Sequence, residues 1–299
     1  MLNKLILVTG AHRSGSTWIG KIISKAPNVR YVHEPFNIGI RRDNSPLTFW
    51  FEYLDHDTEL EKQDIVKRYL NSFYKLSTRH LVEEVLEIRG LRGAYSYLSD
   101  LKRRITDRIV FKDPLAIMSA EWFAYSFKAD VVVSIRHPAA FVASLKVKNW
   151  THDFNHFKKQ HALMKKHLYE FSNLIDYYCS SPPDIISHGI LLWNIIYSRV
   201  NSYRNKYNNI WYFVRHEDLS KEPVREFKQL FDFLNIKFTN EVENEILDST
   251  QAESESDLRR KSISNIYTWK ERLTSSEINR IRIGTEKISK LFYNEADWD

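Results

Sequence analysis

The sequence predicts an α/β fold with three layers, in which helices flank both faces of a central, mainly parallel sheet. Short apolar segments typical of buried strands recur along the chain, and Ala129–Ile135 is the clearest of them. Segments with helical spacing of apolar residues follow such strands, as Ser16–Ser24 follows Lys4–Val8. Strands separated by helices favour a parallel sheet, because each parallel connection must cross one of its faces.

The other expected elements continue this alternation. Residues 44–107, rich in aromatic and charged side chains, are predicted to be a largely helical insertion. No Gly/Ser-rich or low-complexity linker separates the elements, so we expect one domain over residues 1–299. Further strands are predicted at 28–33, 109–111 and 210–214, and further helices from Pro138, within 155–178 and 187–206, and over Pro223–Leu234.

The composition excludes several classes of protein. The chain has 299 residues, 43% of them hydrophobic, which is enough for a substantial core, whereas glycine and proline are too sparse for a fibrous or disordered protein. A net charge of +6 fits an anionic ligand but does not by itself indicate nucleic-acid binding. Cys179, the only cysteine, rules out an intramolecular disulfide and fits a reducing compartment.

The apolar runs of the chain are short. The N-terminal run Met1–Val8 is too short for the apolar region of a signal peptide. The longest other run, Gly189–Ile196, falls well short of the roughly 20 residues that span a bilayer. We therefore expect a cytoplasmic protein without a membrane span.

A glycine-bounded loop from Gly10 to Gly15 lies between the first predicted strand and helix. In this context the backbone N–H groups of a loop converge, and the helix N-terminus adds positive potential. Glycines at both ends allow backbone angles that a side chain would forbid. The hydroxyls of Ser14, Ser16 and Thr17 can donate further hydrogen bonds, so the loop is predicted to bind phosphate in a P-loop-type fold.

The loop departs from the pattern of nucleotide triphosphatases. Those proteins place Lys-Ser/Thr after the second glycine, where the lysine contacts the β- and γ-phosphates. Here Ser16 and Thr17 follow Gly15, and the cation lies inside the loop at Arg13. A P-loop kinase that uses ATP is therefore kept as an alternative that the loop does not favour, and no metal is expected.

With its flanking residues, the loop resembles that of a known family. Arg13-Ser-Gly-Ser-Thr-Trp18 resembles the 5′-phosphosulfate loop of sulfotransferases that use 3′-phosphoadenosine-5′-phosphosulfate (PAPS), including bacterial and carbohydrate-type members. Arg136, at the end of the predicted strand 131–135, and Ser144 have the spacing of the family's 3′-phosphate ligands. The resemblance implies cofactor-binding roles for Arg13, Ser14, Gly15, Ser16, Thr17, Trp18, Arg136 and Ser144.

Two further segments resemble the family in the same order. Phe111-Lys-Asp-Pro114 resembles the strand end whose lysine contacts the transferred sulfuryl group, which implies that role for Lys112. His216-Glu-Asp-Leu219, followed by Pro223, resembles a segment that we interpret as structural.

A third segment, Arg259-Arg-Lys261, resembles the one that covers the 3′-phosphate and adenine in the family, with Trp269 downstream. The resemblance implies that Arg260 and Lys261 bind the cofactor. Here the sequence departs from the family's pattern, because Ser262 replaces a glycine and the gap to Trp269 is longer.

Transfer of a sulfuryl group to a hydroxyl needs positioned cations and a general base within hydrogen-bond reach. Arg13 and Lys112 are the expected catalytic cations. Glu34 is the preferred base, because it directly follows a strand expected beside the loop strand, where several bacterial and carbohydrate sulfotransferases carry a catalytic glutamate. Asp113 stands where the cytosolic small-molecule enzymes carry their catalytic histidine. Asp113, His33 or another group stay open as alternatives.

The resemblance implies PAPS as sulfuryl donor and a hydroxyl-bearing acceptor. The segment around Glu34 favours a carbohydrate or glycan, and the aromatic residues within 44–107 are expected to bind it, because rings stack on sugars. His152 and His156 have helical spacing but lack a third ligand, so we predict no metal site. A non-enzymatic binder of nucleic acid or another polyanion is the second alternative, and the sequence does not indicate an oligomeric state.

Overall fold

The computed structural model describes residues 5–42, 44–73, 107–251 and 266–299. In these ranges five strands form one parallel sheet in the order β2-β3-β1-β4-β5, so β1 lies at its centre. The carboxyl ends of β1 and β4 lie side by side, since Gly10 is paired with Ser134. The strands are β1 (Ile6–Gly10), β2 (Val29–His33), β3 (Arg108–Lys112), β4 (Asp130–Ile135) and β5 (Tyr212–Arg215).

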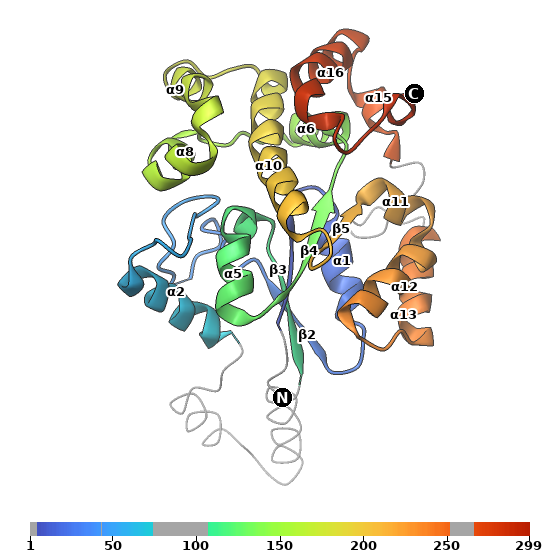
Figure 1. Cartoon of the computed structure of the whole chain (residues 1–299). Helices are drawn as coiled ribbons and strands as arrows, with labels where there is room; N and C mark the ends of the chain where they lie inside the picture. Colours follow the sequence, from blue (N-terminus) through green and yellow to red (C-terminus); the bar gives the residue numbers. More distant parts are fainter. Residues whose placement is uncertain (1–4, 43, 74–106, 252–265) are drawn as a thin grey trace.

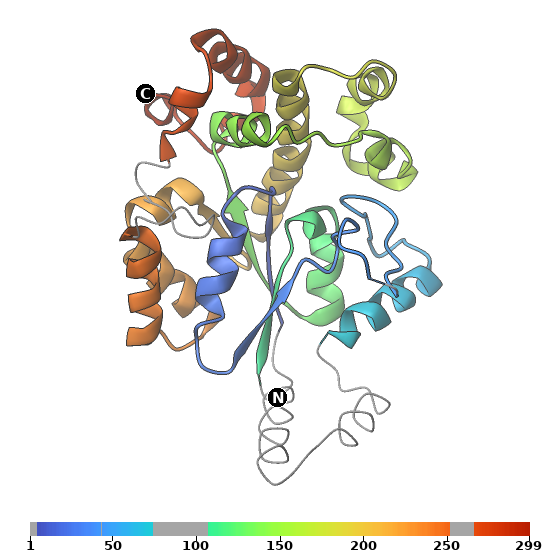
Figure 2. The ribbon, with the colours of Figure 1, turned by 180° about the vertical axis from the view of Figure 1, so that it is seen from behind.

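Alternate residues of the buried strands supply two hydrophobic cores, one on each face. In β1, Leu7 belongs to one core, whereas Ile6 and Val8 belong to the other. Figures 1 and 2 show helices on both sides of the sheet, which confirms the predicted three-layer α/β fold. The first face carries α2 (Leu60–Ser72), α5 (Ala120–Phe127), α6 (Pro138–Lys148) and α10 (Ile185–Tyr207), and the second carries α1 (Ser16–Ile23), α11 (His216–Lys221), α12 (Pro223–Leu234) and α13 (Asn240–Gln251).

The remaining helices are short or C-terminal. The C-terminal helices α15 and α16 pack against α6, and α16 also packs against α10 (Figure 1). No helix in the described ranges combines the length and apolar character that a membrane span requires. The helices are α7 (Asn155–Lys158), α8 (His161–His167), α9 (Ser172–Ser180), α15 (Trp269–Arg272) and α16 (Ser275–Ser289), with the 3₁₀ helices η1 (Pro114–Ser119), η2 (Tyr169–Phe171) and η3 (Glu295–Asp297).

In two segments predicted to be helical, the structure adds detail. Residues 44–59 form turns rather than helix, because side chains hold their backbone: both Thr48 and Phe49 donate their N–H groups to the Glu52 carboxylate at 3.0 Å. Within the predicted insertion only α2 is helical in the described residues, and residues 74–106 lie outside them. The segment 155–178 is divided into α7, α8, η2 and α9.

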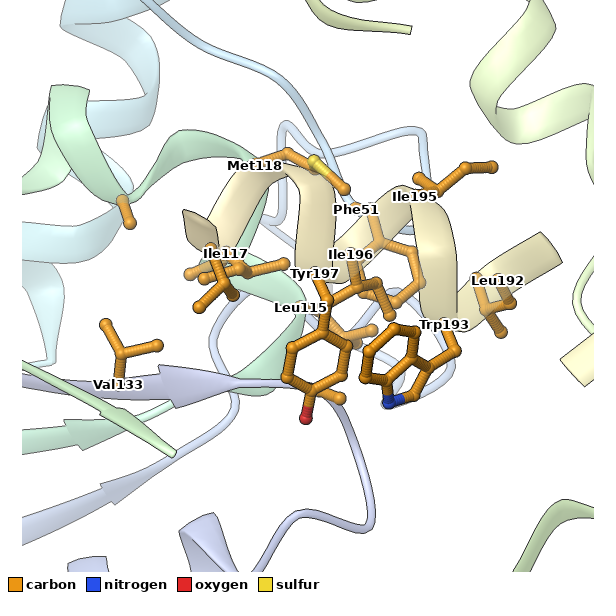
Figure 3. Packing of buried hydrophobic residues seen from close by; sticks show 14 of the residues in the cluster. Phe51, Leu115, Ile117, Met118, Val133, Leu192, Trp193, Ile195, Ile196 and Tyr197 are labelled. Carbon is orange, nitrogen blue, oxygen red and sulfur yellow. The ribbon is translucent and has the colours of Figure 1, made fainter. Parts of the chain in front are cut away.

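Helix α10 fixes the end of β4 through two stacked aromatic side chains. The rings of Trp193 and Tyr197 lie 4.3 Å apart, at an angle of 21°. Figure 3 shows their polar atoms pointing to the same side of the helix. Arg136 donates its backbone N–H to the Tyr197 hydroxyl at 2.6 Å, and Trp193 Nε1 donates to the Arg136 carbonyl at 3.1 Å. The backbone of Arg136 is thus held on both sides.

Candidate active site

The predicted phosphate loop connects β1 to α1 and requires both of its glycines. Gly10 has a φ of 135°, and a Cβ there would lie 2.3 Å from the carbonyl oxygen of Ser134. Gly15 has a φ of 91°, and its Cβ would lie 2.4 Å from Nδ1 of His216. Such φ values and such close approaches exclude a side chain. The loop therefore packs directly on β4 and on the first residue of α11.

The start of α1 keeps the features of an anion site. Its N-cap is Gly15, which has no side chain to cap the helix, and its first turn has no acidic residue. The N–H groups and the positive potential of the helix N-terminus therefore face no competing carboxylate from this turn. The Ser134 hydroxyl donates to the carbonyl of Ser14 at 2.5 Å and fixes the loop before the helix.

Ser16, Thr17 and Trp18 form the first turn of α1. Trp18 faces the second core: its Nε1 donates to the Ser249 hydroxyl at 2.9 Å, and its ring packs edge-on against Phe227. The indole of Trp18 thus ties the loop helix to α12 and α13.

The second predicted phosphate pocket lies next to the loop. Arg13 donates from Nε to the hydroxyl of Ser144 on α6 at 2.8 Å, so two predicted ligands meet across the chain. The Arg136 side chain is buried, and its Nε and Nη1 have no hydrogen-bond partner among the described residues. Burial lowers the pKa of Arg136, and the charge of Arg13 adds to that effect. Two guanidinium groups and a hydroxyl with unused donors fit a bound phosphate.

Lys112 and Glu34 form an ion pair at the ends of β3 and β2. The register of the two strands pairs His33 with Lys112, and Glu34 donates its N–H to the Lys112 carbonyl at 2.9 Å. Lys112 Nζ donates to one oxygen of Glu34, while Asn37 donates to the other at 2.5 Å. Burial alone would raise the pKa of Glu34, but Lys112 and Asn37 lower it overall. Glu34 is therefore ionised at neutral pH and able to accept a proton.

Asp113, the neighbour of Lys112, has a different environment. Its two oxygens accept backbone N–H groups from Phe36 at 2.5 Å and from Leu115 at 3.0 Å, which caps η1 and anchors the turn after Glu34. The side chain is buried, and this burial raises its pKa to about 7, with the Glu34 charge adding to the rise.

This raised pKa gives a testable dependence of stability on pH. Between the ordinary value of 3.8 and about 7 the folded protein binds more protons at Asp113 than the unfolded chain, so this carboxyl makes stability fall as pH rises. An Asp113→Asn variant lacks this contribution. We expect the variant to have a lower free energy of unfolding than the parent protein at pH 4. The difference between the two free energies, measured by urea titration, should shrink as pH rises from 4 to 7. A difference that stays constant over this range would contradict the raised pKa.

The remaining predicted residues lie in different settings. His33 is exposed, and its ring contacts the Tyr31 hydroxyl at 3.3 Å and the Glu34 carboxylate at 3.8 Å. Burial of part of the ring lowers the pKa of His33, and Lys112 adds to this. Arg260 and Lys261 lie outside the described residues. No group of three or more His, Cys, Asp or Glu in the part of the chain that the structure describes could hold a metal ion.

Two residues of this region were not predicted as site residues. Asn37 donates a hydrogen bond to the Glu34 carboxylate. It lies only three residues after Glu34, so this contact could have been predicted from the sequence. Glu217 lies 3.8 Å from Nε of Arg136, measured from its Oε1. No local pattern could reveal this contact, because the two residues come from different strand ends.

A parallel sheet whose central strand ends in a glycine loop before a helix is the arrangement of a P-loop-type α/β protein. The family model described as "Sulfotransferase domain" matches residues 3–291. The chain therefore belongs to the sulfotransferase family and is a transferase, as the resemblance of its motifs implied.

Solved structures agree at the level of the fold. The sulfotransferase domain from the curacin biosynthetic pathway is 15% identical, with a TM-score of 0.53, over 98% of this chain and 99% of that one. The sulfotransferase domain of the Synechococcus PCC 7002 olefin synthase is also 15% identical, with a TM-score of 0.50, over 98% of this chain and 95% of that one. No curated protein sequence matches the chain.

Proposed function

We propose that this sulfotransferase moves a sulfuryl group from PAPS to a hydroxyl acceptor. The observation that carries the proposal is the junction of the two anion pockets, where Arg13 of the loop donates to Ser144 and its charge acts on the buried Arg136. PAPS carries a phosphate at each end of its ribose, and these adjacent pockets match that pattern. The loop N–H groups with Arg13 would hold the 5′-phosphosulfate, and Arg136 with Ser144 the 3′-phosphate. PAPS supplies the sulfuryl group on a phosphate leaving group.

Lys112 and Glu34 are the proposed catalytic pair beside the loop. Lys112 is almost fully buried, and its ammonium meets Glu34 at the carboxyl edge of the sheet, where the loop also begins. Lys112 would stabilise charge on the transferred group. Glu34 would accept the proton of the acceptor hydroxyl. Asp113 is the less supported base, because both of its oxygens already accept backbone N–H groups.

The proposed acceptor is a saccharide, bound by the segment that begins at residue 44. Arg42, which lies just before that segment, links it to the base. Arg42 donates to the carbonyl of Glu34 at 3.0 Å, and its guanidinium lies over the ring of Phe73, 5.6 Å from the centroid. The Arg42 guanidinium thus joins Glu34 to the Phe73 ring, and the aromatic residues of the segment support an acceptor that stacks on rings, as sugars do. Residues 74–106 of this proposed region lie outside the described residues.

Calorimetry with 3′-phosphoadenosine-5′-phosphate (PAP), adenosine 5′-phosphate (AMP) and ATP tests the donor. We expect PAP to bind with a micromolar or lower Kd and AMP and ATP to bind at least tenfold more weakly, since only PAP fills both pockets. Binding of ATP without binding of PAP would favour a kinase instead. Equal, strongly salt-dependent binding of PAP and a heparin fragment would favour a polyanion binder.

A further inference from the structure

Glu217, the second residue of α11, is a buried carboxylate beneath the proposed 3′-phosphate pocket. Its exposed fraction is 4%, and that of Arg136 is 7%. Oε1 accepts the backbone N–H of His137 at 3.1 Å, and Oε2 accepts the Tyr293 hydroxyl at 3.0 Å. The carboxylate thus joins the turn after β4, the start of α11 and the C-terminal segment.

The carboxylate neutralises Arg136 without occupying its donors. Oε1 lies 3.8 Å from Nε, which is within ion-pair range but too long for a hydrogen bond. Nε and Nη1 of the guanidinium accordingly have no hydrogen-bond partner among the described residues. A buried charge without a counter-ion is strongly destabilising, whereas a hydrogen-bonded pair would use the N–H groups that a phosphate needs.

Tyr293 fixes the carboxylate in this position. It follows α16, its ring lies edge-on against His137 at 4.9 Å between centroids, and the guanidinium of Arg215 lies over it at 5.0 Å. Arg215 is held in turn by Asp218 and Asp297. The C-terminal segment therefore prevents Glu217 from moving toward the guanidinium to form a tighter pair.

We propose that Glu217 is a positioning residue that serves as the internal counter-ion of Arg136, taking the electrostatic place of the 3′-phosphate while the nucleotide is absent. The inference rests on the proposed function, because it requires an anion at Arg136. It has a definite consequence for affinity. A bound 3′-phosphate lies near a buried negative charge, so Glu217 stabilises the free protein and weakens nucleotide binding, which favours product release.

Glu217→Gln tests this with little change of shape. The amide oxygen can accept from His137, and the amide N–H can donate to the Tyr293 oxygen, so the substitution mainly removes charge. We expect the free protein to unfold at a lower temperature. We also expect the Kd of PAP to fall by about tenfold while that of AMP changes little. By linkage, saturating PAP should restore most of the lost stability.

Glu121→Gln is the matched control. Glu121 accepts from the Tyr207 hydroxyl at 2.5 Å and pairs with Arg199 at 3.3 Å, a Tyr–Glu–Arg cluster outside the site. The Glu121→Gln variant should lose the same amount of stability with and without PAP, and its Kd for PAP should equal that of the parent protein. The same result for Glu217→Gln would show a purely structural role and overturn the inference. Weaker PAP binding by Glu217→Gln would also overturn it, since Glu217 would then anchor Arg136 rather than compete.

The failure of the proposed function gives a different result. In that case the parent protein itself would bind PAP no better than AMP, and the site at Arg136 would not be a 3′-phosphate pocket. A parent protein that prefers PAP, together with a tighter and still PAP-selective Glu217→Gln variant, supports both.

Discussion

Glu34→Gln should lower turnover by about 10²–10⁴-fold, the usual contribution of a positioned general base. The substituted amide would keep the shape of the side chain but could not accept the proton of the acceptor hydroxyl. PAP affinity should change little, because Glu34 contacts Lys112 and Asn37 rather than the two phosphate pockets. Initial rates with labelled PAPS and a panel of sugar, lipid and phenol acceptors would measure the loss and identify the acceptor class.

A matched control is Glu277→Gln, which removes a carboxylate paired with Lys146 at 2.8 Å on α6 and α16. Turnover of that variant should stay within about twofold of the parent, because Glu277 contacts Lys146 and the start of α16 and neither the loop nor Lys112. Unchanged turnover in Glu34→Gln would transfer the role of base to another group.

The pH profile of kcat distinguishes the two carboxyl candidates. A general base must be deprotonated, so activity is lost as pH falls through its pKa. For Glu34 that loss should lie below 4.5, its ordinary value, because Lys112 and Asn37 lower its pKa against the effect of burial. For Asp113 the loss would lie near pH 7, since burial raises its pKa to about 7. A loss of kcat near pH 7 that disappears in the Asp113→Asn variant would contradict the assignment of Glu34 as the general base.

Arg136→Met should weaken PAP binding by about 10²–10³-fold, since removing one partner of a buried charge pair typically costs 2–5 kcal/mol. AMP lacks the 3′-phosphate, so its Kd should change much less. The ratio of the Kd of PAP to the Kd of AMP, both measured by calorimetry, reports on the 3′-phosphate pocket alone, because partial unfolding would weaken the binding of both nucleotides. A ratio equal to that of the parent would place the 3′-phosphate elsewhere.

The same substitution leaves Glu217 buried without its cation, which destabilises the fold by about 3–5 kcal/mol. Adding Glu217→Gln to Arg136→Met should recover part of that stability but none of the PAP affinity. This double variant therefore shows that weak binding arises from the missing guanidinium and not from partial unfolding.

Much of the architecture was predictable because it depends on local patterns. Mostly apolar segments such as Val131–Ile135 identify strands buried on both faces, and the glycines around Arg13 identify the loop. Residues 44–59, the first part of the predicted largely helical insertion 44–107, are not helical, because the buried carboxylate of Glu52 binds backbone N–H groups and competes with helix formation. That competition depends on the burial of the Glu52 side chain, which the spacing of apolar residues in the sequence does not predict.

The sequence by itself determined the glycine loop between β1 and α1, its missing lysine and the family, since each depends on short motifs whose own residues lie close together along the chain. Only the tertiary structure decided how separate strand ends combine. It paired Lys112 with Glu34, enclosed Asp113 among backbone donors, and set Glu217 against Arg136. The charge and pKa of a group depend on neighbours that folding brings within a few ångströms and on the water that it removes. Neither is encoded in any local stretch of sequence.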